Sequence, residues 1–199
     1  MTRRGMLRIT AMAAGGFAGL FAAVALIAPH PRLLWNASPS APIGLYWLRP
    51  DQDPQMGALV AIHPPATLGR FMAKRRYLPL GVPLLKHVAA QSGSRVCRWG
   101  TQISIDGQTV AVALLVDSHG RPLPVWRGCR DIEPGQFFLL NPSTDSLDSR
   151  YLGLIPASGL IGRAMPILTR DAPNAPLRWH IGCTEIAFFI SMQGEGPCR

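Results

Sequence analysis

The chain has 199 residues, about the length of one domain. Only 16% of the residues are charged and 48% are hydrophobic, which excludes an acidic disordered chain and a coiled coil because both need far more charge. The net charge is +9, but the basic residues are scattered and form no basic helix, so no nucleic-acid binding is expected.

The first predicted element is a membrane-spanning helix. Three arginines within residues 1–8 precede an uncharged apolar run over residues 9–28. About 20 such residues cross the ~30 Å apolar core of a bilayer as a helix. The arginines hold the N-terminus in the cytoplasm, which predicts a single-pass protein of the inner membrane with its remaining domain in the periplasm. The alternative is a cleaved signal peptide, with Ala23-Val24-Ala25 as the cleavage site.

Residues 29–170 are predicted to form a single, mainly β domain. The segment 29–50 is rich in proline and is interpreted as a linker leading into short extended pieces. Short apolar runs bounded by Gly, Pro, Asp or Asn follow, and Asp106-Gly107 between two of them predicts a β-hairpin. No helical periodicity is visible between residue 28 and the tail. The predicted strands are residues 58–62, 84–90, 102–105, 109–116, 136–140 and 160–168.

The C-terminal extension, residues 171–199, has a different composition. It begins with a linker-like segment and continues into an apolar stretch over residues 181–192. That stretch is too short to span a membrane. A packed helix, a lipid-surface segment and a poorly ordered extension all remain open, and the role of the extension is not predicted.

The cysteines all lie on the predicted outer side of the membrane. An oxidising compartment allows disulfides, and four cysteines allow three pairings. Cys97 and Cys129 flank the hairpin region and form one candidate pair, while Cys183 and Cys198 form a second pair within the extension. Since the chain has no Cys-x-x-Cys and no His-Glu-x-x-His motif, no metal or other cofactor is expected.

Lys86 is the first candidate for chemistry. It interrupts the apolar run 82–90, which otherwise has the composition of a buried strand. Burial favours the neutral form of a lysine, and a neutral amine can act as a general base. The alternative is an ordinary strand residue whose ammonium group reaches out to water.

Two hydroxyl-rich segments are candidates for the nucleophile. Residues 36–46 place Ser38 and Ser40 in a proline-constrained turn directly after the membrane helix. Residues 143–151 combine hydroxyls and carboxylates just after an apolar strand. The alternatives are a plain Ser/Pro linker for the first segment and a solvated loop with local Asx turns for the second.

Together these segments resemble the bacterial type I signal peptidases, and more closely their conjugation-type branch, which processes conjugative pilins. The resemblance extends over about residues 35–168 and is carried by Ser40-Ala41-Pro42-Ile43-Gly44, by Lys86-His87-Val88-Ala89 and by Ser146-Leu147-Asp148-Ser149-Arg150-Tyr151-Leu152-Gly153. It implies a β-domain of signal-peptidase type. The chain departs from the usual family pattern where Ser92-Gly93-Ser94 replaces Pro-Gly-Asp and Leu140-Asn141-Pro142 replaces Gly-Asp-Asn.

The resemblance implies a serine endopeptidase with a Ser–Lys dyad. Neutral Lys86 takes the proton of Ser40 as the serine Oγ attacks the scissile carbonyl. The Ser40 N–H and the Ser38 hydroxyl form the oxyanion hole. The supporting residues are Ser146, which orients the lysine amine, and Asp148 and Arg150, which form an ion pair.

The implied substrate is an exported preprotein, in the conjugation-type branch a pilin precursor, with small residues before the cleavage site. The acyl-enzyme is resolved by water or by an amine of the substrate's own chain, which gives a cyclic pilin. Membrane lipid is a second expected partner, with Leu45, Tyr46 and Trp47 at the interface. The alternatives are a non-catalytic membrane-anchored assembly factor on the same fold and a periplasmic ligand-binding β-domain.

Overall fold

The computed structural model describes residues 3–27 and 33–180, which belong to two separate units. The first unit contains the helix α1 (Arg3–Ile27). Its segment Gly5–Val24 is the one helical stretch in the described part of the chain that is long and apolar enough to cross a membrane. Twenty helical residues measure about 30 Å, the thickness of the apolar core of a bilayer.

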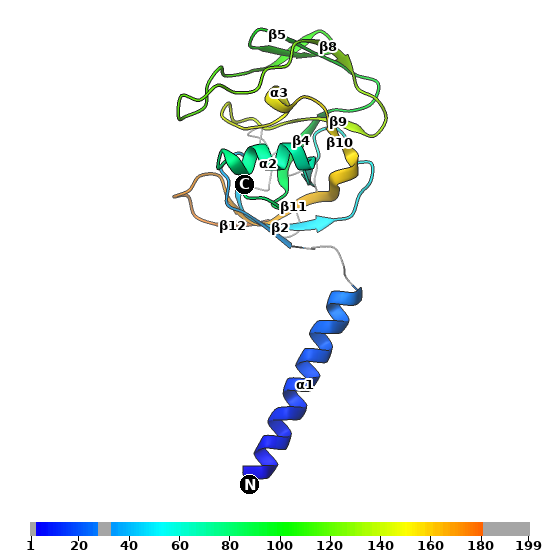
Figure 1. Cartoon of the computed structure of the whole chain (residues 1–199), viewed down its shortest axis with the longest axis vertical. Coiled ribbons are helices and arrows are strands. Elements are labelled where there is room, and N and C mark those ends of the chain that lie inside the picture. Colours follow the sequence, from blue (N-terminus) through cyan, green and yellow to red (C-terminus); the bar gives the residue numbers. More distant parts are fainter. Residues whose placement is uncertain (1–2, 28–32, 181–199) are drawn as a thin grey trace. The chain divides into compact units, whose positions relative to one another are not determined.

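The second unit is a mainly β domain made of two antiparallel sheets (Figure 1). The large sheet has eight strands in the order β1-β2-β11-β3-β4-β9-β10, with β12 paired to β11. The small sheet has the order β7-β6-β5-β8 and lies at the opposite end of the domain from β2, β11 and β12. The strands are β1 (Leu33–Asn36), β2 (Ile43–Arg49), β3 (Leu59–Ile62), β4 (Leu84–Ala90), β5 (Arg95–Trp99), β6 (Gln102–Ile105), β7 (Gln108–Val112), β8 (Gly128–Asp131), β9 (Gln136–Leu140), β10 (Ile155–Pro156), β11 (Leu160–Arg170) and β12 (Arg178–Trp179).

The centre of the large sheet is covered on both faces. All four residues of β3 are buried: Val60 and Ile62 join one hydrophobic cluster, while Leu59 and Ala61 join another on the opposite face. A strand that is buried on both faces has a continuous apolar sequence instead of an alternating one. The neighbouring β4 is also largely buried, so its Lys86 lies in the core.

The helix α2 (Ala66–Lys74) contradicts the prediction that no helix lies between residue 28 and the tail. Its apolar residues Leu68, Phe71 and Met72 follow helical spacing and pack against the core, where Met72 is buried. A nine-residue helix has too little intrinsic stability to form alone, so tertiary packing stabilises it. The apolar periodicity of this helix covers too few residues to predict a helix from the sequence, and it directly follows Pro64 and Pro65.

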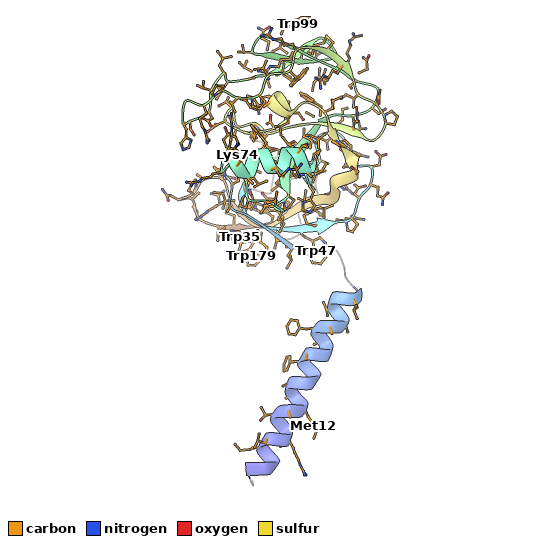
Figure 2. All side chains as sticks on the ribbon, viewed as in Figure 1. Met12, Trp35, Trp47, Lys74, Trp99 and Trp179 are labelled. Atoms are coloured by element: carbon orange, nitrogen blue, oxygen red, sulfur yellow. A yellow bond between two sulfur atoms is a disulfide. The ribbon has the colours of Figure 1, made fainter. Side chains whose placement is uncertain are left out.

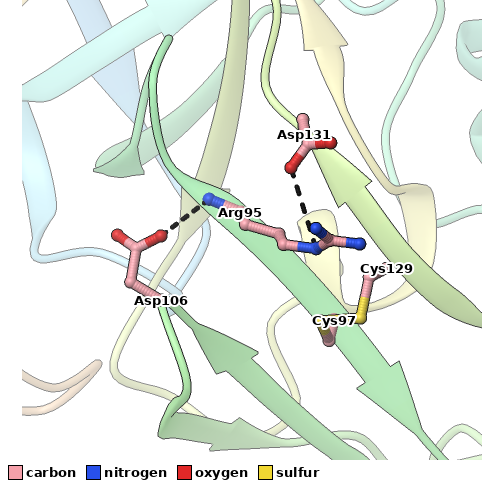
Figure 3. The surroundings of a disulfide bond; sticks show 5 residues. All are labelled: Arg95, Cys97, Asp106, Cys129 and Asp131. Carbon is pink, nitrogen blue, oxygen red and sulfur yellow. Dashed lines mark hydrogen bonds and ion pairs between the residues drawn. A yellow bond between two sulfur atoms is a disulfide. The ribbon is translucent and has the colours of Figure 1, made fainter.

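The small sheet confirms the predicted hairpin and contains a disulfide. Asp106 and Gly107 both have positive φ angles, of 50° and 83°, and connect β6 to β7. The second hairpin strand is shorter than predicted, because β7 ends at residue 112. Cys97 on β5 and Cys129 on β8 are register partners and form a disulfide (Figure 3).

The predicted C-terminal extension contributes one short strand to the large sheet. β12 pairs with β11 through the partners Leu168 and Trp179. The second candidate cysteine pair, Cys183 and Cys198, and the apolar stretch 181–192 lie outside the described residues. Predictions for these segments therefore stay predictions.

Candidate active site

Ser40 lies in the loop 37–42, which joins β1 to β2. The buried side chain of Asn36 shapes this loop from within. Its Nδ2 donates to the backbone carbonyls of Ser38, Ala41 and Pro42, at 2.9, 3.1 and 3.0 Å, and its Oδ1 accepts the Ser38 N–H at 3.0 Å. One asparagine therefore holds both sides of the turn that presents the candidate nucleophile.

The strand after this loop explains two further residues of the motif. Tyr46 is fully buried and its hydroxyl donates to the carbonyl of Pro42 at 2.6 Å, so the prediction that Tyr46 contacts lipid is wrong. Gly44 has a φ of +149° and lies directly against the backbone of Leu168 on β11. A Cβ at this position would collide with the Leu168 carbonyl, which is why the motif contains glycine here.

Lys86 lies in the middle of β4 and points to the same face as Leu84 and Val88, which belong to a hydrophobic cluster. It is only 4% exposed. Its Nζ lies 3.3 Å from the Ser40 Oγ and 2.7 Å from the Ser146 Oγ. Burial lowers the pKa of Lys86 from 10.5 to about 8, although the charge of Asp148 opposes this shift.

The oxyanion-hole candidates lie beside this pair. The Ser38 Oγ is 3.1 Å from the Ser40 Oγ, and the Ser40 N–H donates to the Ser38 Oγ at 3.4 Å. The hydroxyls of Ser38, Ser40 and Ser146 therefore form one hydrogen-bonded series that passes through the amine of Lys86. The structure thus brings together four of the residues that the sequence singled out.

Asp148 and Arg150 lie behind Ser146 and form a buried ion pair. Both carboxylate oxygens of Asp148 accept from the guanidinium, each at 3.0 Å. Asp148 also caps the short helix α3 (Ser149–Leu152) by accepting the Arg150 N–H at 3.1 Å. The guanidinium also donates to the carbonyls of Asn141 and Thr144, which closes the loop 141–148 around Ser146.

Asn141 connects this loop to the strand of the lysine, a role that the sequence did not reveal. The ladder between β9 and β4 ends at the pair Leu140 and His87. The Asn141 side chain then takes the place of the next backbone residue: its Nδ2 donates to the Leu85 carbonyl at 3.1 Å, and its Oδ1 accepts the His87 N–H at 3.3 Å. Asn141 therefore holds the backbone on both sides of Lys86.

A cavity of about 620 Å³ opens beside Ser40 and Lys86. Its lining is mainly apolar and includes Leu34 of β1, Met72 of α2 and Tyr77 from the segment that follows α2. A cavity with apolar walls and a few convergent polar groups is typical of a substrate site. The Cys97–Cys129 disulfide belongs to the small sheet and does not line this cavity.

Comparisons with known proteins show the family to which the chain belongs. The family model described as "Signal peptidase, peptidase S26" matches residues 3–169. The chain is 39% identical over 145 residues to the "Probable conjugal transfer protein TraF" of Sinorhizobium fredii, an alignment that covers 67% of this chain and 76% of that protein. It is 38% identical over 148 residues to the "Conjugal transfer protein TraF" of Agrobacterium fabrum, with coverages of 68% and 82%.

Two further matches are more distant. The "Plasmid transfer protein TraF" of Escherichia coli is 30% identical over 170 residues, which cover 79% of this chain and 94% of that protein. The crystal structure of a signal peptidase I from Enterococcus faecalis aligns with 56% of this chain and 96% of its own, with a TM-score of 0.34 and 17% identity.

The chain therefore belongs to the signal peptidase family, peptidase S26. Within this family, the TraF relatives place it in the TraF-like branch that the sequence motifs indicated. Its one N-terminal apolar helix, α1, together with the family, indicates a membrane-anchored protein.

Proposed function

We propose that this protein is a membrane-bound serine endopeptidase that removes the leader peptide from an exported precursor, with a conjugative pilin precursor as its substrate. The observation that carries the proposal is the position of the buried Lys86 amine, within hydrogen-bonding distance of both the Ser40 and Ser146 hydroxyls. The TraF relatives support a role in conjugation.

The chemistry begins with proton transfer from Ser40 to the neutral amine of Lys86. With a pKa of about 8, roughly a tenth of the amine is neutral at pH 7, whereas an ordinary lysine is almost fully protonated. Ser146 accepts an N–H of the amine and thereby directs its lone pair toward Ser40. The Ser40 Oγ then attacks the scissile carbonyl and forms an acyl-enzyme.

The developing oxyanion is stabilised by the Ser40 N–H and the Ser38 hydroxyl. These groups bond to each other in the structure, so the substrate oxygen takes the place of that contact. One such donor contributes roughly 3–4 kcal/mol in comparable hydrolases. Water then releases the shortened precursor, or the substrate's own amine attacks the acyl-enzyme and closes a ring.

We place the β-domain on the periplasmic side of the inner membrane, with lipid as a partner. Trp35, Trp47 and Trp179 are exposed and lie at one end of the domain (Figure 2). The register pairs Trp35 with Leu45, Leu45 with Leu168 and Leu168 with Trp179, so these side chains share one sheet face. Tryptophan is enriched where proteins meet the membrane interface, which supports this placement.

The decisive experiment is co-expression with an exported pilin precursor, followed by mass spectrometry of the ends of the precursor. We expect the wild type to shorten the precursor, and Ser40→Ala and Lys86→Ala to leave it intact. Lys74→Ala is the matched control, since Lys74 is the only other lysine in the chain and is exposed. A product lighter by one further water indicates ring closure instead of hydrolysis.

The second candidate is a non-catalytic assembly factor of a conjugation apparatus, favoured by the transfer-protein names of the relatives. It predicts an unprocessed precursor in every strain and unchanged conjugation frequency in Ser40→Ala. Loss of conjugation in Ser40→Ala, with normal levels of the folded protein, would reject this candidate.

A further inference from the structure

One wall of the substrate cavity does not belong to the large sheet. It includes Met72 on α2 and Tyr77 and Leu78 in the segment that follows the helix. Strand hydrogen bonds hold the walls built from β1 and β4, but they do not reach this segment. Other contacts must therefore fix the position of the Tyr77 side chain.

The Tyr77 ring packs against Phe71 and the hydrophobic core, and its hydroxyl is held by Asp117, in the loop between β7 and β8. Its Oδ2 accepts the Tyr77 hydroxyl at 2.5 Å and the Arg121 Nε at 2.7 Å. Its Oδ1 accepts the backbone N–H groups of His119 and Arg121, at 2.9 and 2.8 Å. Burial disfavours the ionised carboxylate, but these donors outweigh it and hold the pKa of Asp117 well below its usual range.

Two arginines form further contacts between the segment that follows α2 and the loop between β7 and β8. Arg75, directly after α2, donates to the Pro122 carbonyl at 2.6 Å, and Arg121 donates to the Arg75 carbonyl at 3.2 Å. The Arg121 guanidinium also lies over the Tyr77 ring, 5.0 Å from its centre, in a cation–π contact. We call Tyr77, Asp117 and Arg121 the tyrosine clamp.

We propose that the tyrosine clamp determines substrate selectivity: Asp117 and Arg121 are positioning residues that hold Tyr77 as a rigid wall, which limits the size of the substrate side chain that fits beside it. The inference rests on the proposed function, since it concerns the same cavity. A cavity wall discriminates between side chains of different size only if it is rigid. A tyrosine without these contacts has several rotamers available and can move aside for a larger side chain. A single methylene changes substrate preference by about 10- to 200-fold in a rigid apolar pocket.

The test compares two precursors that differ in one residue before the cleavage site, alanine in one and leucine in the other. Tyr77→Phe removes the hydroxyl and keeps the ring. Asp117→Asn places an amide opposite two donors, the Tyr77 hydroxyl and the Arg121 Nε. Asp131→Asn is the matched control, because Asp131 forms an exposed ion pair with Arg95 in the small sheet (Figure 3).

We expect each clamp variant to reduce the preference for alanine over leucine, measured as the ratio of the two kcat/KM values, roughly tenfold. The reduction should come mainly from a lower KM for the leucine precursor. The double variant should match the single variants, because both remove the same contact. Asp131→Asn should keep the wild-type ratio.

An unchanged ratio in folded Tyr77→Phe and Asp117→Asn would overturn the proposal, and so would the same change in Asp131→Asn. If Asp117→Asn does not fold, Tyr77→Phe decides the question alone. Failure of the wild type to cleave either precursor would instead reject the proposed function. In that case, the affinities of the alanine and leucine leader peptides are measured for wild type and for Tyr77→Phe. The same ratio of the two affinities in both proteins would overturn the proposed role of the clamp.

Discussion

The two halves of the candidate site are each organised by a buried asparagine, but over very different sequence distances. Asn36 holds the Ser40 loop through partners no more than six residues away. Asn141 holds the Lys86 strand through Leu85 and His87, more than 50 residues away. The nucleophile half is therefore a local structure, whereas the base half exists only when β4, β9 and the loop 141–148 have assembled.

This difference predicts that the two halves of the site contribute unequally to stability and to activity. The base half is buried and forms part of the core of the domain, with Lys86, Asn141 and Arg150 all under 5% exposed. The nucleophile half is a loop at the edge of the cavity, where Ser38 is exposed and Ser40 is half-buried. Changes in the base half should therefore cost more stability than changes in the nucleophile half, which should mainly impair catalysis.

The largest effect is expected from Arg150→Met, which leaves the Asp148 carboxylate buried without its partner. We expect the free energy of unfolding to fall by about 3–5 kcal/mol, measured by urea denaturation. Arg95→Gln is the control, because its ion pair is exposed and should change stability by less than about 1 kcal/mol. Equal losses of unfolding free energy in the two variants would contradict the view that the Asp148–Arg150 pair matters for stability because it is buried.

The pH dependence tests the protonation state of the base. Burial lowers the pKa of Lys86 to about 8, so the neutral amine becomes the major form above that pH instead of above 10.5. We expect kcat/KM to rise about tenfold per pH unit below pH 8 and to level off above it. A rate that stays constant between about pH 6 and 9 would contradict Lys86 as the base.

The same pKa shift of Lys86 also predicts how the stability of the fold changes with pH. The native state has the lower lysine pKa, so between pH 8 and 10.5 the unfolded chain binds more protons than the folded one. The contribution of Lys86 to stability therefore becomes more favourable as the pH rises through this window. Lys86→Met removes the titration, so the stability of wild type relative to this variant, measured by urea denaturation, should rise across the same window.

Asn141 offers a more selective test of the base half. Asn141→Ala removes the contacts on both sides of Lys86 and should cost about 2 kcal/mol of unfolding free energy. Asn141→Asp keeps the shape but adds a negative charge next to Lys86, which should raise the pKa of Lys86 and move the midpoint of the pH–rate profile upward. An unchanged midpoint in a folded Asn141→Asp variant would contradict this role.

The smallest loss of stability is expected from Asn36→Ala, since the contacts of Asn36 are local. About 1 kcal/mol should be lost in urea denaturation, whereas kcat should fall by more than about tenfold because the Ser40 loop loses its shape. Asn174→Ala is the matched control, at an exposed asparagine outside the site. If Asn36→Ala unfolded the domain as severely as Arg150→Met, the distinction between the two halves would be wrong.

Local patterns in the sequence determined a large part of this protein. The apolar run predicted α1, the short runs predicted four of the eight strands of the large sheet (β3, β4, β9 and β11), and Asp106-Gly107 predicted the hairpin of the small sheet. Each of these features depends on hydrophobic periodicity or turn chemistry within a few residues. The three motif segments also marked where Ser40, Lys86 and Ser146 lie in the chain.

The local patterns do not show which of these residues meet: the family resemblance implied the contacts of Lys86, and the tertiary structure forms them. The contacts of Lys86 with Ser40 and Ser146 join positions 46 and 60 residues apart. The bridging role of Asn141 arises because β9 ends one residue before it, and the clamp on Tyr77 depends on a loop 40 residues further along. Such contacts follow from strand pairing and packing, which leave no periodic signal at the residues concerned.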